Sequence, residues 1–368
     1  MTLASSATRT GIANLPLHYG KVPPWLFQRM ARLAREITIF IVTEFGAEEM
    51  LRRMSDPHWF QAFGCVLGYD WHSSGVTTTL CGALKEGLRG LEEELGLFVA
   101  GGKGRTSRRT PTEIENFGHA ISVDPSPLVY ASRMTAKVDN SALQDGYQLY
   151  HHTFLFTING SWAVVQQGMN ESNSYARRYH WLGEAVTDFV CEPHAAICSQ
   201  GRGEVLNLVA RESAPARITI TSIATELQPE RVSDNLKRLK TLNLPHRHYL
   251  SLQDIHPDRL GKSLGIIYER QPKGFEGLLS LEGVGQKTIR ALSLISELVY
   301  GVPASFRDPA RYSFTHGGKD GYPFPIDRET YDKSIILLIQ AVHKARVDTT
   351  EKREALSRLD RVRYLRTY

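Results

Sequence analysis

The 368-residue sequence has no apolar run long enough to cross a membrane. A membrane-spanning helix needs about 20 predominantly apolar residues, whereas the longest apolar clusters, residues 37–42 and 335–339, are much shorter. The N-terminus also lacks the apolar core of a signal peptide, and Arg9 interrupts it early. We therefore expect no membrane span and a cytoplasmic location.

Cysteine is also scarce, and the sequence has no C-x-x-C pair. Cys191 and Cys198 flank His194, but the six residues between the two cysteines do not match the usual spacing of a zinc knuckle. We therefore expect buried reduced thiols, at Cys65 and Cys81 as well, and no metal. A zinc site at Cys191, His194 and Cys198 is the alternative, and the sequence identifies no cofactor.

The residues that are present are typical of a folded protein: 42% are hydrophobic, 23% are charged, and 15 Tyr, 14 Phe and 5 Trp argue against extensive disorder. The net charge of +5 is unevenly divided. Residues 1–230 have 20 Lys and Arg against 23 Asp and Glu, and residues 231–368 have 24 against 16. A basic C-terminal region suits a protein that binds nucleic-acid phosphates, although a solvated basic tail explains part of the excess.

Hydrophobic periodicity predicts an α+β fold that is mostly helical, with a central antiparallel β-hairpin or small sheet. Asn159-Gly160 is a typical two-residue hairpin turn. Strands are expected at residues 97–100, 150–158, 162–166 and 205–208. Helices are expected at residues 24–45, 47–54, from 57 onward, 77–88, from 110 onward, 174–190, 229–239, 257–268, 328–346 and 351–364.

This pattern predicts four regions, with a boundary at the proline-containing polar stretch around residue 215. They are a disordered N-terminus (1–10), an α+β domain with the hairpin (11–215), a helical domain (216–347) and a charged C-terminal helix or tail (348–368).

The most informative motif is FEGLLSLEGVGQKTIRAL at residues 275–292. It matches the helix-hairpin-helix pattern L-x-G-h-G, in which h is apolar, and we expect this unit over residues 275–300. The two glycines permit a tight turn with positive φ and let a phosphate approach the backbone. Turn amides and the dipole of the second helix would then form an anion site. The expected contact residues are Gly283, Val284, Gly285, Gln286, Lys287 and Arg290.

The same segment resembles the helix-hairpin-helix DNA glycosylase superfamily, the endonuclease III-like enzymes. In that family the catalytic lysine follows the second hairpin glycine by two positions, which is Lys287 here, and Phe324-Pro-Ile-Asp327 looks like the context of the catalytic aspartate. The resemblance implies glycosylase or AP-lyase chemistry, with Lys287 as the Schiff-base nucleophile and Asp327 as the activating carboxylate. It covers about 50 residues, and the gap between lysine and aspartate is forty residues where the family has roughly twenty.

Other polar residues are candidates for catalysis or phosphate contact. His72 lies in a predicted turn, and the hairpin strands bring Asp145 and His151 toward one cleft suited to general acid–base or nuclease-like chemistry. Turns and interior hydrogen bonds are the ordinary alternatives. Further cations with glycine or aromatic neighbours are candidate nucleic-acid contacts or, equally, solvated positions: Lys103 and Arg105 in one loop, Arg177 and Arg178 on the expected 174–190 helix, and His316 and Lys319 in another loop.

Several longer runs resemble the domain-of-unknown-function 763 family (DUF763) of archaea and bacteria. They are RTGIANLPLHYG (9–20), WHSSG (71–75), DGYQ (145–148), WAVVQQGM (162–169), ARRYHW (176–181) and HGGKDG (316–321). The resemblance extends over roughly residues 9–346 and implies no known activity.

The sequence therefore predicts a nucleic-acid-binding protein of DNA processing or repair, which contacts the DNA backbone without reading bases. Whether it is an enzyme is left open. A non-enzymatic DNA-binding or scaffold protein is one alternative. An enzyme acting on a nucleotide or a phosphorylated small molecule is the other, and a deep pocket joining His72, Asp145 and His180 would favour it.

Overall fold

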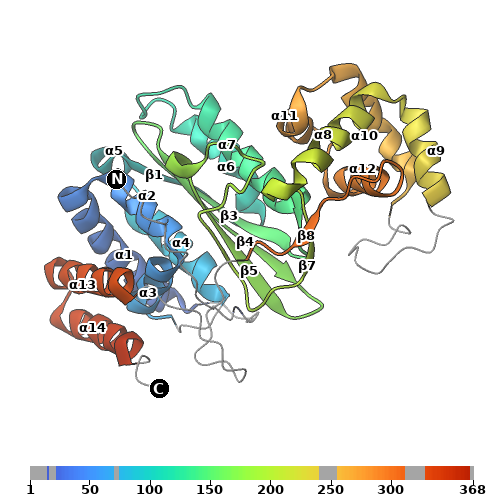
Figure 1. Cartoon of the computed structure of the whole chain (residues 1–368). Coiled ribbons are helices and arrows are strands. Elements are labelled where there is room, and N and C mark those ends of the chain that lie inside the picture. Colours follow the sequence, from blue (N-terminus) through green and yellow to red (C-terminus); the bar gives the residue numbers. More distant parts are fainter. Residues whose placement is uncertain (1–14, 16–21, 70–73, 240–254, 311–327, 365–368) are drawn as a thin grey trace, which may run out of the picture.

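The computed structural model describes residues 15, 22–69, 74–239, 255–310 and 328–364. The fold is α+β and mostly helical, as the sequence predicted (Figure 1). Five antiparallel strands form the main sheet in the order β1 (Leu97–Lys103), β3 (Gln148–Thr157), β4 (Trp162–Asn170), β5 (Tyr175–Leu182) and β6 (Ala196–Cys198). A second sheet has the order β2 (Leu143–Gln144), β7 (Glu204–Asn207) and β8 (Ser305–Arg307).

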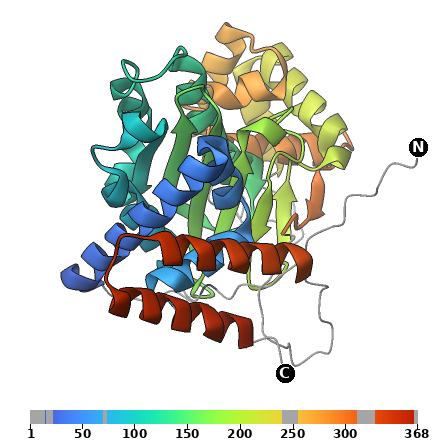
Figure 2. The same ribbon diagram turned by 90° about the vertical axis from the view of Figure 1, so that its left-hand side faces the viewer.

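One face of the main sheet is covered by a helical layer whose core includes Leu155 and Val165 (Figures 1 and 2). Local signals start and end its helices: Gly46, with φ +88°, separates the first two, and the Asp56 carboxylate accepts hydrogen bonds from the first-turn amides of the third. The layer consists of α1 (Pro24–Phe45), α2 (Ala47–Ser55), α3 (Pro57–Leu67), α4 (Gly75–Leu88), α13 (Arg328–Lys344) and α14 (Thr349–Tyr364). α13 packs against α1 and α3, although the sequence analysis grouped it with the helical region.

The opposite face of the sheet carries an aromatic core that includes Phe98, Phe154 and Phe156. α6 (Thr110–Asn116) and α7 (Ser126–Lys137) cover it, and a unit of five helices packs beyond α7 (Figure 1). That unit, called the C-terminal helical unit below, consists of α8 (Ala214–Glu226), α9 (Pro229–Leu239), α10 (Pro257–Arg270), α11 (Gly274–Ser280) and α12 (Gln286–Leu298). The shorter helical segments are α5 (Glu92–Leu95), η1 (Gly104–Arg109), η2 (Val138–Ala142), η3 (Gly183–Ala185) and η4 (Arg211–Ser213).

The predicted β-hairpin is confirmed. β3 and β4 are antiparallel neighbours with Phe156 opposite Trp162, and Gly160 in the turn has φ +84°. In the part of the chain that the structure describes, no helix is long and apolar enough to cross a membrane.

The helix expected at residues 174–190 is wrong, because β5 occupies residues 175–182. Its neighbours β4 and β6 satisfy its backbone hydrogen bonds. Arg177, Tyr179 and Trp181 face one side of the sheet, and Arg178 and His180 face the other. Because both faces are buried, the strand does not show the alternation of apolar and polar residues that identifies a half-exposed strand.

Candidate functional site

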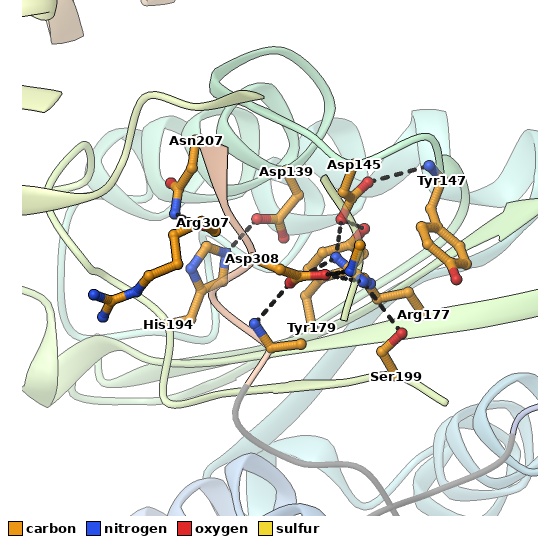
Figure 3. Close-up of polar contacts among 12 residues, drawn as sticks. Asp139, Asp145, Tyr147, Arg177, Tyr179, His194, Ser199, Asn207, Arg307 and Asp308 are labelled. Atoms are coloured by element: carbon orange, nitrogen blue, oxygen red, sulfur yellow. Dashed lines mark hydrogen bonds and ion pairs between the residues drawn. The ribbon is translucent and has the colours of Figure 1, made fainter. Parts of the chain in front are cut away.

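A buried carboxylate, Asp139, lies on the face of the main sheet toward α7 and on the π-helical turn η2. Its Oδ2 atom accepts hydrogen bonds from Gln166 Nε2 at 2.6 Å and Trp181 Nε1 at 2.9 Å. Its Oδ1 atom is bonded to His194 Nε2 (Figure 3). His152 continues this network to Ser132. A fully buried carboxylate is tolerated only when its oxygens are satisfied in this way.

A second buried group surrounds Arg177 (Figure 3). Its guanidinium lies 3.0 Å from Asp145 Oδ2 and 2.7 Å from Asp308 Oδ2, and Tyr179 Oη donates to Asp145 at 2.7 Å. Burial opposes the charge of Arg177, but the two carboxylates outweigh it and raise the pKa of the guanidinium. The structure therefore does not place Asp145 or Arg177 where a substrate or a phosphate could reach it, and gives no support to their predicted roles. Both side chains are buried, and each is the other's ionic partner.

Arg178 belongs to the opposite face of the sheet, toward α3. Its guanidinium donates to Gln61 Oε1 at 3.1 Å and lies 4.4 Å from the centre of the Phe60 ring. Burial lowers the pKa of the adjacent His180 well below its usual value, and the positive charge of Arg178 acts in the same direction. Arg178 is fully buried, so its predicted contact with phosphate is also wrong.

His151, a predicted base, is buried on the same side as Arg178, where its Nε2 atom bonds Thr153 Oγ1 at 2.9 Å. Burial, assisted by His152 and Lys103, lowers the pKa of His151 to about 3. Asp145 faces the other side of the sheet, so the structure does not bring the two residues into one cleft. The predicted site residues His72, His316, Lys319 and Asp327 lie outside the described residues.

The cysteines are not joined by disulfide bonds, and only Cys191 is partly exposed. Burial raises the pKa of Cys81 to about 12 and that of Cys198 to about 11, although Arg178 nearby favours both thiolates. His194 bonds Asp139 on the other face of the sheet, so it does not converge with Cys198. Among the described residues, no group of three or more His, Cys, Asp or Glu is arranged to hold a metal ion, and the alternative zinc site is not supported.

The predicted hairpin motif consists of α11, a five-residue turn (281–285) and α12. Gly283 has φ +83° and is exposed, Val284 is buried in the core, and Lys287 is exposed. Lys137 at the end of α7 donates to the carbonyl oxygens of Leu281, at 2.9 Å, and of Val284. The carbonyl groups of the turn therefore anchor it to α7.

Arg290 of α12 was expected to contact nucleic acid, but its side chain is buried. Its Nε atom donates to Gln144 Oε1 at 2.9 Å, and Gln144 Nε2 donates to the carbonyl of Gln286 at 3.0 Å. Burial lowers the pKa of Arg290 to about 10. The predicted nucleic-acid contact at Arg290 is wrong, because this residue joins α12 to β2. The predicted contacts Lys103 and Arg105 are exposed at the end of β1 and in η1.

A cavity of about 320 Å³ lies beside the Asp139 network. His194 borders it with a side chain that is 6% exposed, and no described residue bonds its Nδ1 atom. From the sequence alone His194 was a candidate only for metal binding, since no local signal connects it with Asp139. The other lining residues include Glu192, Arg202, Asn207, Glu212, Arg307 and Asp308.

Comparison with protein families matches residues 11–326 to the family described as "Protein of unknown function (DUF763)". No curated protein matches the chain, and no solved structure matches it. The resemblance of the hairpin segment to DNA glycosylases is therefore not supported. Because the family match spans most of the 368 residues, the chain belongs to the DUF763 family.

Proposed function

We propose that this protein binds nucleic acid by contacting the phosphate backbone at the turn between α11 and α12. The observation that carries the proposal is a set of unused donors: the amides of Gly283, Gly285 and Gln286 donate to no other described residue. Gly283 is exposed, and Gly285 and Gln286 are partly exposed. Backbone amides at the N-terminus of a helix are well suited to bind a phosphate, because they combine hydrogen-bond donors with the positive end of the helix dipole.

The contacts around the turn favour the binding of a phosphate to these amides. Lys137 holds two of its carbonyl groups, and Ser263 Oγ donates to the carbonyl oxygen of Gly283 at 2.8 Å. These three carbonyl oxygens therefore already accept hydrogen bonds from the protein, and the unused polar groups of the turn are its amides. Lys287, in the first turn of α12, adds an exposed cation.

The charge of the region supports the same function. Residues 231–310, which include α10, α11 and α12, carry 12 Lys and Arg against 8 Asp and Glu, and such an excess attracts polyanions over a distance of about 10 Å. AP-lyase chemistry is not part of the proposal. A Schiff-base lysine is activated by removal from water, whereas Lys287 is exposed.

Gly285→Ala tests the proposal cleanly. Gly285 has an extended backbone with φ −137°, and a Cβ atom there would meet no other atom within 4 Å. We expect an intact fold but roughly tenfold weaker binding to a DNA oligonucleotide, because the methyl group occupies the approach to the amides, a loss of about 1.4 kcal/mol. Fluorescence anisotropy at several salt concentrations measures both the affinity and its salt dependence.

Gly261→Ala in α10 is the matched control, since its Cβ atom also enters open space. Gly261 precedes Ser263 by two positions, which places it about 200° away around the helix from the residue that contacts the turn. Equal affinities for parent, Gly285→Ala and Gly261→Ala would overturn the proposal. So would binding by the parent protein that does not weaken as salt is raised.

A further inference from the structure

Asp139 orients the ring of His194 so that the ring can accept a proton. Both Asp139 oxygens are occupied, one by His194 and the other by Gln166 and Trp181, so the carboxylate cannot rotate away from the ring. A carboxylate bonded to Nε2 favours the neutral tautomer that carries its proton there. The lone pair is then on Nδ1, which no described residue bonds, in a ring that borders the cavity.

We infer that this cavity is a hydrolytic site for a phosphodiester, in which His194 is the general base that activates water and Asp139 is its positioning residue. The inference rests on the proposed function for its choice of substrate, a nucleic-acid strand. The arrangement of the pair and the cavity stands independently of that function.

Two guanidinium groups of the cavity are suited to bind a phosphate ester. Arg202 and Arg307 line the cavity, and Arg202 is held at the rim by a 2.9 Å hydrogen bond from Nε to the carbonyl oxygen of Ala310. Three carboxylates also line it, and each has a partner: Glu192 lies 3.8 Å from Arg211, and Glu212 accepts a 2.9 Å hydrogen bond from Ser305. The third lining carboxylate, that of Asp308, is paired with Arg177. A volume of about 320 Å³ is within the range of small-ligand sites and suits one nucleotide-sized group.

The cavity is connected to the hairpin through one short segment of chain. Lys137 bonds the turn, Asp139 bonds His194, and Gln144 bonds α12. These three residues lie within eight consecutive positions, which include η2. π-Helical turns are rare and often occur at functional sites. A strand held by the hairpin would therefore lie on a turn that is anchored by the same segment that positions the base.

The reaction consumes one water molecule. As the water oxygen forms a bond to phosphorus, His194 Nδ1 accepts a proton from it, and Asp139 stabilises the imidazolium that results. The phosphorus–oxygen bond to the leaving alkoxide breaks, with its electron pair going to that oxygen. The leaving oxygen then takes the proton from His194, directly or through solvent. The products are an alcohol and a phosphomonoester, and His194 returns to its neutral form.

The test uses the full chain with bis(p-nitrophenyl) phosphate, a diester too small to need the hairpin, and with single-stranded DNA and RNA. We expect hydrolysis by the parent protein and a loss of kcat of about 10²–10⁴-fold in His194→Gln. Asp139→Asn should cause a similar loss, because its amide would donate to Nε2 and place the ring proton on Nδ1. His119→Gln is the matched control, since His119 is exposed and lies 3.6 Å from the exposed carboxylate of Glu93.

Ring nitrogen NMR of the parent protein separates positioning from a merely structural role and needs no variant. We expect Nδ1 of His194 to be unprotonated at neutral pH, and to become protonated in Asp139→Asn. The pH profile of kcat/KM should contain an ionisation that His194→Gln removes. The charged groups that bond His194 or line the cavity with it are Asp139, Glu192, Arg202, Glu212, Arg307 and Asp308.

Three results would overturn the inference: no hydrolysis of any of the three substrates, an unchanged rate in His194→Gln, or a parent ring protonated on Nδ1. Failure of the proposed function is distinguishable from these. Absence of DNA binding together with His194-dependent hydrolysis would overturn the hairpin proposal alone.

Discussion

The arginines of β5 and the cation of the α11–α12 hairpin look alike in sequence but have opposite environments. Arg177 is 2% exposed and lies between two carboxylates, whereas Lys287 is exposed beside a turn with unused amides. A phosphate could reach Arg177 only by leaving buried carboxylates unpaired, which is very costly. The comparison teaches that a local cluster of cations does not identify a nucleic-acid surface. The acidic groups that the fold brings to those cations decide their role.

The largest effect should come from removing the positive charge of Arg177 in β5. Arg177→Met leaves Asp145 and Asp308 buried without their partner, and we expect the free energy of unfolding to fall by about 3–5 kcal/mol. Urea unfolding followed by circular dichroism measures this change. Arg211→Met is the control: its side chain is 82% exposed, so we expect a change within about 0.5 kcal/mol. A variant at Arg177 as stable as the parent would show that the two regions do not differ as we describe.

The second largest effect should be that of low pH on stability, because the sheet contains buried histidines. Burial lowers the pKa of His151 to about 3 and also lowers that of His152. The unfolded chain therefore binds more protons than the folded chain below pH 6.5. The free energy of unfolding should fall as pH drops from about 6.5 toward 3, by at most about 1.4 kcal/mol per pH unit for each histidine.

His151→Gln should make that dependence shallower, whereas substitution of the exposed His119 by Gln should leave it unchanged. Urea unfolding at pH 7.0, 5.5 and 4.5 gives the slope for each protein. Identical slopes for His151→Gln and the parent would mean that His151 does not resist protonation in the folded state.

The smallest effects on stability should be those of substituting the two glycines of the hairpin turn. Comparing the two variants separates a role in stability from a role in binding. Gly283→Ala places a side chain at φ +83° and should destabilise the protein by about 1–2 kcal/mol. Gly285→Ala should change stability by less than about 0.5 kcal/mol, because its backbone is extended and the surrounding space is open. Thermal unfolding compares the two variants. Equal destabilisation would indicate that both glycines serve packing, as in an ordinary αα-hairpin.

Local signals predicted much of the fold. Pro24, Gly46 and Asp56 mark the ends of the first three helices, and Asn159-Gly160 predicts the turn between β3 and β4. These features depend on residues only a few positions apart, so a single sequence contains the information for them. β5 was mistaken for a helix because a strand buried on both faces shows no period of two.

The two candidate sites also differ in this respect: one is formed by neighbouring residues and the other by distant segments of the chain. The hairpin turn is contained in five consecutive residues, and Lys287 follows it by two positions, so the exposed Gly283 and Lys287 belong to one short motif of the sequence. Asp139 and His194 are 55 positions apart, and the pair forms only because η2 and the chain before β6 pack on the same face of the sheet. Arg290 illustrates the converse, because β2, far away in the sequence, supplies the Gln144 side chain that holds it inside.

By itself, the sequence determined the local elements, the turn with its two glycines and the basic excess of the C-terminal region, since each depends on neighbouring residues or on composition. Only the tertiary structure decided which cations are buried, which carboxylate orients His194 and where a cavity lies. Burial and ion pairing depend on chain segments far apart in the sequence, and their contacts exist only once the sheet and its two helical layers have packed together.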